Sequence, residues 1–408
     1  MTHRQTLEHL KPIVQYFQDY TNLDKHSPGF GLTSDHTQNP DRASISASGF
    51  MVCAMILGAH YGWIETQKAQ EILKNTVESL SRMNHFKGIF PHFLDRNTAL
   101  RYGRCEYSTI DTTLMIMGLL AVDVYCNDAP TTQRVQRLLE RIDYEAFKTT
   151  YQGKKVFAMS YNELEHGDYT QAGTGFIYQW HMYAEQLMKY WLYPGDDALE
   201  LYHNLEFHIG SYGDYSYRYS PGNTLFIYHF PLAFLNLKDA FDDRGFSPYL
   251  NAQKATLSHR QASIDLMSQY RTFGPHAFGF NASDTPQGYR VFHGLPNVHD
   301  KIVTDGTVAP FSVVGSLPYL GDSIWESIEY LKTIPGLYGP YGFMDAFNQE
   351  NGLWVSDKII SIDKGLELLS LDAADEGIIH ALIAKHPAIK AGFKRLKYTI
   401  RGDSHGND

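Results

Sequence analysis

The sequence has few cysteines, no long apolar run and no excess of basic residues, and each shortage excludes a class of protein. Its 408 residues include only three cysteines, Cys53, Cys105 and Cys126, without CxxC spacing, which fits neither a disulfide framework nor a zinc knuckle. The formal charge of -10 excludes the basic field that nucleic acid or an anionic membrane surface requires. We therefore expect no nucleic-acid partner and no membrane partner.

Motifs for nucleotide, metal and serine chemistry are missing as well. The chain has no GxGxxG opening a helix after a strand, no GxxxxGK[ST] and no GxSxG at a strand-to-helix elbow. Its 19 histidines contain no HExxH and no HxH spacing, and scattered histidines are usually structural. No cofactor and no metal site are expected.

Nothing in the chain indicates a targeting segment or a domain boundary. Polar residues interrupt its first helix-like stretch throughout, which is typical of neither a signal peptide nor a membrane anchor. We expect a cytoplasmic protein from the sequence as given, or a periplasmic or secreted one if a leader has been removed. No low-complexity linker interrupts the composition, so residues 1–408 are predicted to form one domain.

Apolar residues recur mainly at helical spacing. Strand patterns are expected only at 155–161 and 278–281. Almost wholly apolar helices alternate with amphipathic ones, which favours an all-α fold of two concentric layers: an α/α toroid of six hairpins around an axial pocket. The predicted helices span 7–17, 44–57, 64–80, 109–124, 131–139, 176–192, 198–208, 223–242, 249–268, 309–317, 323–333, 364–371 and 376–385.

Rings and carboxylates crowd into one stretch near the C-terminus. Residues 336–348 contain three glycines and a proline, which favour turns, and they carry Tyr338, Tyr341 and Asp345 on predicted loop. Trp354 and Asp363 follow closely. Flat apolar faces beside acids are typical of a carbohydrate site, so an oligo- or polysaccharide is the expected partner.

Further acids precede or interrupt apolar helices. Asp35 lies on a loop before the small-residue helix at Ser44, where the serines serve close packing. Asp111 begins an apolar helix, where capping by Asp111 or Ser108 competes with a place in a cleft. Glu106, five residues earlier, favours the cleft.

Glu185 follows Trp180 on the helix expected at 176–192. There it either pairs with Lys189 at i+4 on the surface or faces the pocket with a raised pKa as a proton donor. Asp284 lies in a polar turn that we expect at the rim.

Together these clusters resemble the glycoamylase-like family that includes bacterial endo-β-1,2-glucanases and the transglycosylating domain of cyclic β-1,2-glucan synthases. The resemblance runs through nearly the whole chain in order. It rests on Gly31-Leu, 43–50, His92-Phe-Leu-Asp, 106–112, Trp180 with Glu185, Leu225-Phe, 255–257 with Arg260-Gln, 281–284 with Gly288-Tyr, 305–310, 341–347 with Trp354, and Ile362-Asp-Lys-Gly.

The resemblance implies an α/α six-hairpin toroid and a glycoside hydrolase that needs no metal. By position, Glu185 matches the family's general acid and Asp111 an essential acid, while Asp345 and Asp363 match C-terminal carboxylates near the sugar. The chain departs from the family at Asn236 and Lys238, where many relatives have Asp and Arg, and at Lys364, where Gln is usual.

We therefore expect an endo-acting β-1,2-glucanase. Glu185 would protonate the departing oxygen, and one of Asp111, Asp345 and Asp363 would act as base in an inverting reaction or as nucleophile in a retaining one. A transglycosylase, another β-glucan hydrolase and a non-catalytic sugar-binding protein are the alternatives. The predicted substrate-binding residues are Asp35, Glu106, Tyr161, Trp180, Asp284, Tyr338, Tyr341 and Trp354, of which Tyr161, Trp180, Tyr338, Tyr341 and Trp354 are the candidates for stacking on sugar rings.

Overall fold

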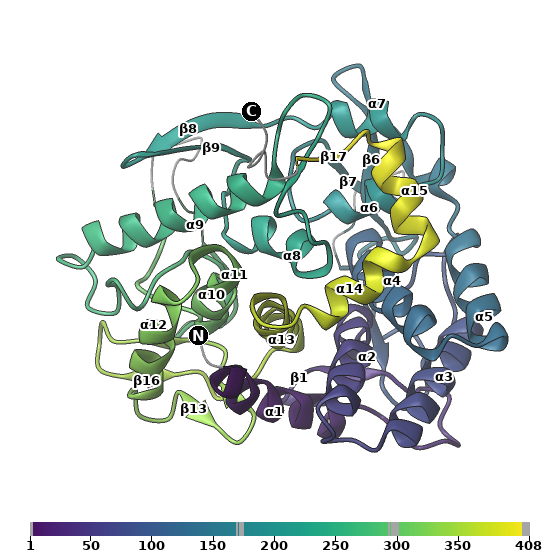
Figure 1. Ribbon diagram of the computed structural model, residues 1–408, viewed down its shortest axis with the longest axis horizontal. Helices are drawn as coiled ribbons and strands as arrows, with labels where there is room; N and C mark the ends of the chain where they lie inside the picture. The colour runs from purple at the N-terminus through teal and green to yellow at the C-terminus, as the bar shows by residue number, and fades with distance from the viewer. Residues whose placement is uncertain (1–2, 169, 171–174, 293, 295–301, 402–408) are drawn as a thin grey trace, which may run out of the picture.

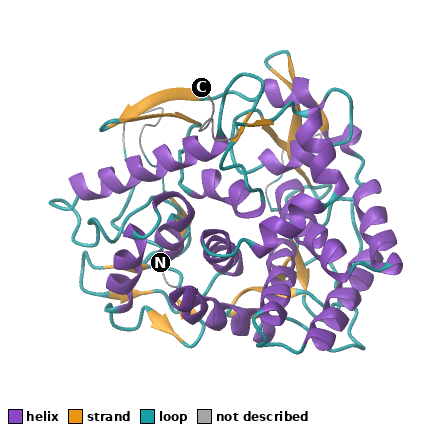
Figure 2. Ribbon diagram, in the orientation of Figure 1, coloured by secondary structure: helices purple, strands orange, loops and turns teal. Residues whose placement is uncertain are grey.

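A computed structural model describes residues 3–168, 170, 175–292, 294 and 302–401, and its described part is mostly helical (Figures 1 and 2). The helices are α1 (His3–Asp19), α2 (Ile45–His60), α3 (Thr66–Arg82), α4 (Thr109–Cys126), α5 (Ala129–Glu140), α6 (Leu187–Leu192), α7 (Ala198–His203), α8 (Phe226–Phe234), α9 (Pro248–Asp265), α10 (Pro310–Val314), α11 (Leu317–Leu320), α12 (Ser323–Lys332), α13 (Ser361–Ala374), α14 (Ile378–Lys385) and α15 (Pro387–Arg395), with a 3-10 turn at Tyr144–Phe147.

Short antiparallel strands fill the connections between the helices (Figure 2). They form the sheet β1-β2-β3, the sheet β4-β6-β5 with β7 paired to β6, and the two-stranded pairs β8-β9, β10-β17, β11-β12, β13-β14 and β15-β16. Their bounds are β1 (Thr33–His36), β2 (Asn39–Ser44), β3 (Phe93–Asp95), β4 (Tyr107–Ser108), β5 (Lys148–Tyr151), β6 (Lys154–Tyr161), β7 (Phe176–Trp180), β8 (His208–Tyr212), β9 (Tyr215–Tyr219), β10 (Ala240–Phe241), β11 (Ala282–Ser283), β12 (Arg290–Val291), β13 (Tyr338–Gly339), β14 (Gly342–Phe343), β15 (Phe347–Asn348), β16 (Trp354–Val355) and β17 (Thr399–Ile400).

The innermost helices are α2, α4 and α13. Every residue of α2 from Ile45 to Ala59 is buried, because small and apolar residues occupy all its faces. α4 is long and apolar enough to cross a bilayer, but 78% of it is buried against other helices, as in a core helix. α13 lies end-on near the centre of Figure 1 and contacts α1, α2, α8, α10, α11 and α14.

A band of hydrogen bonds ties the N-terminal ends of these three helices together. At α13, the Ser361 hydroxyl donates to the Ser34 carbonyl on β1. β1 pairs with β2, which runs into α2, and the first amide of α2 donates to the His92 carbonyl. The His92 amide donates in turn to the Glu106 carbonyl, two residues before the Ser108 cap of α4. Residues from five distant segments are thereby held at one end of the helical core.

Strands are more numerous than predicted, and the helix expected at 176–192 is wrong. Its first part is strand β7, whose Ile177 pairs with Ser160 and whose Trp180 pairs with Phe157 on β6, and only α6 is helical. Local helical spacing was overridden by pairing with β6, the strand that precedes β7 in the sequence. The strand expected at 278–281 is absent too, since β11 begins at Ala282.

The other predicted helices are present with shifted ends. The helix expected at 223–242 is confined to α8, because Leu235 at its C-cap is extended. α15 follows α14 directly through His386 and was not predicted. One cluster of buried apolar side chains includes residues from Leu10 to Tyr398, so the core extends over most of the chain.

Close packing of α2 on α4 generates a stability prediction. A Cβ added to Gly118 would lie 2.2 Å from the Gly49 carbonyl oxygen. Helix propensity alone predicts that Gly118→Ala stabilises α4 by about 1 kcal/mol, whereas the clash predicts a net loss of about 1–3 kcal/mol. Urea unfolding should show the loss, with Gln133→Ala on the exposed face of α5 as the control. A more stable Gly118→Ala protein would contradict the packing.

Candidate active site

Two of the predicted catalytic acids occupy equivalent places at the joined helix ends. Asp111 is the third residue of α4 and Asp363 the third residue of α13. Both carboxyl groups are buried, with exposed fractions of 5% and 7% for the residues. The positive end of a helix macrodipole favours negative charge in its first turn, so the fold places these acids where their charge is tolerated.

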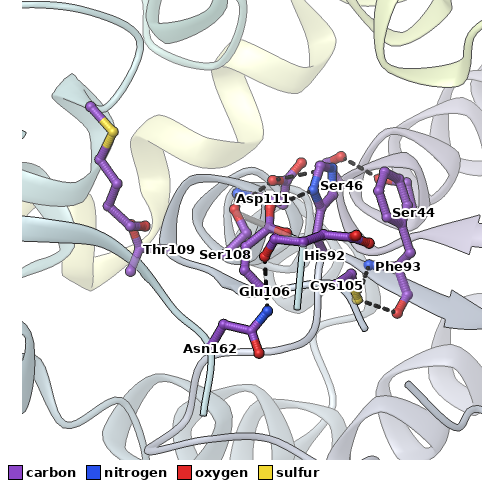
Figure 3. A network of polar contacts seen from close by, with 12 residues as sticks. Ser44, Ser46, His92, Phe93, Cys105, Glu106, Ser108, Thr109, Asp111 and Asn162 are labelled. Carbon is purple, nitrogen blue, oxygen red and sulfur yellow. Dashed lines mark hydrogen bonds and ion pairs between the residues drawn. The ribbon is translucent and has the colours of Figure 1, made fainter. Parts of the chain in front are cut away.

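Asp111 belongs to a buried network centred on His92 (Figure 3). His92 Nδ1 lies 2.8 Å from Glu106 Oε1, and its Nε2 lies 3.6 Å from Asp111 Oδ2. The Ser108 hydroxyl donates to Asp111 Oδ2 over 2.5 Å, and the same oxygen of Ser108 caps the Asp111 amide. Ser108 is therefore the cap of α4, which leaves the Asp111 carboxylate free to face His92.

His92 is held as a cation by its two acidic neighbours. Burial by itself lowers the pKa of the imidazole, but the charges of Asp111 and Glu106 and the hydrogen bond to Glu106 outweigh it and raise the pKa to about 9. Ser44 and Ser46 lie close by at the start of α2, with their hydroxyls 2.8 Å apart (Figure 3). The positive charge of His92 thus interacts with the carboxyl groups of both Glu106 and Asp111.

Asp345 and Asp363 form a second acidic group, in which the two carboxyls hydrogen-bond to each other. Two carboxylates can only accept, so this contact requires a proton on one of them. Burial raises the pKa of Asp363 well above its usual range, and the Asp345 charge raises it further. Burial also raises the pKa of Asp345, to about 6, against the lowering effect of its hydrogen bonds from Asp284 and Asp363. Burial and the neighbouring charge thus favour the protonated form of Asp363.

Asp284 and Asp35 flank this pair. The Asp284 amide donates to Asp345 Oδ2 over 2.7 Å, and its own carboxylate accepts from Ser356 and lies 3.0 Å from Lys358 Nζ. Asp284 is 4% exposed, so the expectation of a residue at the rim is wrong: it packs beneath Asp345. Asp35 lies on β1, pairs with Arg42 at 2.6 Å, and acts electrostatically on both His92 and Asp363.

Glu185 lies in the turn between β7 and α6 and is half-buried. Burial raises the pKa of this carboxyl to about 7, with a further contribution from the Asp111 charge, against a lowering hydrogen bond from its own amide. A carboxylic acid in this range retains its proton near neutral pH and can donate it. Trp180 and Lys189, which flank Glu185 in the sequence, both donate to Thr109 Oγ1, so this turn is attached to the start of α4.

The alternative of a surface ion pair between Glu185 and Lys189 is wrong. Lys189 is 3% exposed and donates its ammonium to Thr109 Oγ1 over 2.8 Å, at the first residue of α4. Burial lowers the pKa of Lys189 well below its usual range. Because α6 begins at Leu187, Glu185 lies outside the helix that carries Lys189, and an i,i+4 pair requires both residues on one helix.

The five candidates for sugar stacking are dispersed. Trp180 is 7% exposed, and its indole N–H donates to Thr109 Oγ1, so it packs against the start of α4. Tyr161 stacks on Phe86 with ring centroids 3.7 Å apart. Tyr338 packs edge-on against His9 of α1, away from the acids.

The remaining two rings lie on the C-terminal hairpins. Tyr341 donates its hydroxyl to Asp19 at the end of α1, and Trp354 is half-buried on β16. None of the five roles in sugar binding is established by these contacts.

A surface cavity and a possible cation cluster lie elsewhere. A cavity of about 620 Å³ between α3 and the loops near Pro28 and Ala99 includes none of the predicted acids in its lining, so we locate the site by its carboxylates instead. His3, Asp375 and Glu376 are close enough together to hold a metal ion, but they lie at the outer ends of α1 and α13. The cysteines Cys53, Cys105 and Cys126 are free thiols.

Two residues of the site were not predicted. His92 belongs to one of the motifs on which the resemblance rests, but no role was predicted for it. Its position after an apolar Phe-Pro pair and before Glu106 could have indicated a buried contact with an acid. Lys364 was noted only as a departure from the family pattern. Its ammonium is buried between Phe343 and Glu367, which no local pattern indicated.

The helical α/α-type fold and the buried acids at the ends of its inner helices are typical of a class of carbohydrate-active proteins. Comparison of the chain with known families and solved structures leads to the same class. The chain belongs to the Glycoamylase family, whose model matches residues 177–387. The family resemblance of the sequence motifs is thereby confirmed.

Three proteins similar to this chain are hydrolases by name. The chain is 21% identical to an exo β-1,2-glucooligosaccharide sophorohydrolase of Parabacteroides distasonis, over 97% of this chain and 59% of that protein. An endo-β-1,2-glucanase of Chitinophaga pinensis, solved with sophorotriose and glucose, superposes with a TM-score of 0.81 at 21% identity, over 98% of this chain and 99% of that one.

A β-1,2-glucanase structure from P. distasonis has a TM-score of 0.82 at 19% identity, over 97% of this chain and 60% of that one. The chain thus spans about three fifths of the two P. distasonis relatives. At these identities the solved structures establish the α/α-type fold.

The His92 network generates a prediction of pH-dependent stability. Because the folded-state pKa is raised to about 9, the stabilisation by His92 is complete below the unfolded-state pKa, near 6.5, and is lost as the pH rises through 9. His92→Gln should cost about 2 kcal/mol at pH 6, and the difference from the wild type should shrink by pH 10. Urea unfolding at both pH values measures this.

The matched control is His26→Gln, at an exposed histidine, which should change stability little at either pH. An equal loss for His92→Gln at pH 6 and pH 10 would show that the imidazole is not held as a cation.

Proposed function

We propose that this protein is a glycoside hydrolase that cleaves β-1,2-glucan internally. The observation that carries the proposal is Glu185, a half-buried carboxylic acid whose pKa of about 7 suits proton donation. It lies between Trp180 and Lys189, which both donate to Thr109 Oγ1 at the start of α4. Its place agrees with the general acid that the family resemblance implies. The names of the relatives support β-1,2-linked glucan as substrate.

In the proposed reaction Glu185 protonates the departing glycosidic oxygen. The base is the ionised member of the Asp345 and Asp363 pair: Asp363 holds the proton, so Asp345 is left to accept one from water. Asp111 is fixed in place by His92 and the Ser108 hydroxyl, and we keep it as a further catalytic candidate beside this pair. We favour the inverting route, in which water occupies the space between acid and base.

We also propose that the helices close into the six-hairpin toroid that the sequence predicts. In this arrangement the joined N-terminal ends of α2, α4 and α13 line one end of the axis, and an oligosaccharide lies across them. The partner is thus a neutral glucan chain. Its hydroxyl groups suit the partly ionised carboxylates of the site.

Incubation with β-1,2-, β-1,3-, β-1,4- and α-linked glucans, followed by product sizing, tests the function. Endo cleavage of β-1,2-glucan should release a ladder of oligosaccharides at early times. A single disaccharide from the start would indicate the exo mode, and products longer than the substrate would indicate transglycosylation. Binding without products would favour the non-catalytic alternative, and turnover of a different linkage alone would reject the proposed substrate.

Replacement of the proton donor tests the mechanism. Glu185→Gln keeps the shape of the side chain and removes the proton, so turnover should fall about 10²–10⁴-fold while oligosaccharide binding is retained. For the wild type, kcat/KM should decline as the pH rises through about 7, because Glu185 must be protonated to act. Glu200→Gln, at an exposed acid of α7, is the control. Near-native turnover of Glu185→Gln would remove Glu185 from the mechanism.

A further inference from the structure

Lys364 makes two buried contacts beside the acidic pair. It follows Asp363 on α13, and its side chain is 2% exposed. The ammonium donates to the Phe343 carbonyl oxygen over 2.7 Å and to Glu367 Oε2 over 2.7 Å. One ammonium therefore binds two separate segments of the chain, the hairpin that ends at Phe343 and helix α13 itself.

The hairpin contact bears directly on Asp345. Phe343 ends β14 two residues before Asp345, and the Asp345 amide donates to the Lys358 carbonyl over 3.1 Å. The backbone around Asp345 is thus attached at two points. The Asp345 amide binds the Lys358 carbonyl, and the Phe343 carbonyl, two residues earlier in the chain, binds the Lys364 ammonium. Asp363 is fixed by α13, the same helix that carries Lys364.

A buried ion pair is a poor source of stability, since the desolvation of two charges offsets most of their attraction. Apolar groups also lie near the ammonium: a Cβ on Gly342 would be 3.7 Å from Lys364 Nζ and 3.8 Å from Ile13, and Phe343 is 1% exposed. An apolar pair would fill this space at no electrostatic cost. The Lys364 and Glu367 pair is therefore better explained by the geometry that it fixes than by stability.

We propose that Lys364 is a positioning residue that clamps the Asp345 segment onto α13, so that the Asp345 and Asp363 carboxyls stay in hydrogen-bonding contact. The inference rests on the proposed function, in which this pair supplies the base. It adds a residue that does not touch the reacting atoms and acts through Asp345.

The charges around the pair determine what loss of the clamp does. Lys364 lowers the pKa of Asp345, and so does the hydrogen bond from Asp363, while the Asp345 charge raises the pKa of Asp363. If the clamp is lost and the carboxyls separate, the pKa of Asp345 rises and that of Asp363 falls. The titratable groups that face the pair are Asp284 from the β11 segment, Lys364 and Glu367 from α13, Asp35 from β1 and Tyr16 from α1.

The test variant is Lys364→Met/Glu367→Met, which removes both charges together and leaves no lone buried carboxylate. The control is Arg4→Met/Glu8→Met, which removes an exposed i,i+4 pair from α1. We expect the test variant to fold and to lose about tenfold or more in kcat on β-1,2-glucan oligosaccharides with little change in KM, since displacement of a catalytic group lowers turnover steeply. The control should keep the wild-type values. If the double variant does not fold, Lys364→Gln takes its place with the same expectations.

A titration without substrate separates this inference from the proposed function. The titrated variant is Lys364→Gln, because it keeps the Glu367 charge, which itself raises the pKa of Asp363. In ¹³C NMR of aspartate-labelled protein, with signals assigned through Asp345→Asn and Asp363→Asn, the two carboxyl titration steps should move towards each other in this variant. Loss of the Lys364 charge without movement would raise the Asp345 step and would not lower the Asp363 step, and that result would overturn the clamp, as would unchanged steps with wild-type kcat. A wild-type protein that cleaves no glucan rejects the proposed function, while the titration still decides the role of Lys364.

Discussion

The structure depends on the burial of several carboxyl groups at one end of a helical core, where few cations are available to balance them. Asp111 and Asp363 each take the third position of an inner helix, where the helix dipole favours an acid. That contribution is too small to offset full desolvation of so many charges. Two further effects reduce the buried negative charge. The His92 cation lies between two of the acids, and the raised pKa of Asp363 favours its neutral form.

These two solutions give the two halves of the site different chemistry. On the α4 side His92 lies between Glu106 and Asp111, and its positive charge is shared by the two acids. On the α13 side burial and the Asp345 charge raise the pKa of Asp363 well above its usual range, so this acid favours its protonated form. A site that contains both a retained proton and an ionised acid has the ingredients for general acid and base catalysis.

The strands, which look secondary in a helical protein, bring these halves together. β1 and β2 connect the start of α13 to the start of α2, and the hydrogen bonds through His92 continue the connection to α4. β7 also positions an acid of the site. Its pairing with β6 ends at Trp180, so Glu185 lies in the turn that follows and not on a helix. A carboxyl in a turn can point along the helix ends, where the other acids lie.

The sequence by itself determined the helical class, the family and which acids matter, because periodicity and ordered motifs are local in the chain. Asp111 and Ser108 are an example: an acid and a serine at a helix start are recognisable from spacing alone. Only the tertiary structure decided that Glu185 lies in a turn after a strand and that Asp284 is buried against Asp345. The contacts of His92 and Lys364 with acidic side chains were likewise decided there. Strand pairing, desolvation and contacts of a buried ammonium join residues far apart in the sequence, so no local pattern encodes them.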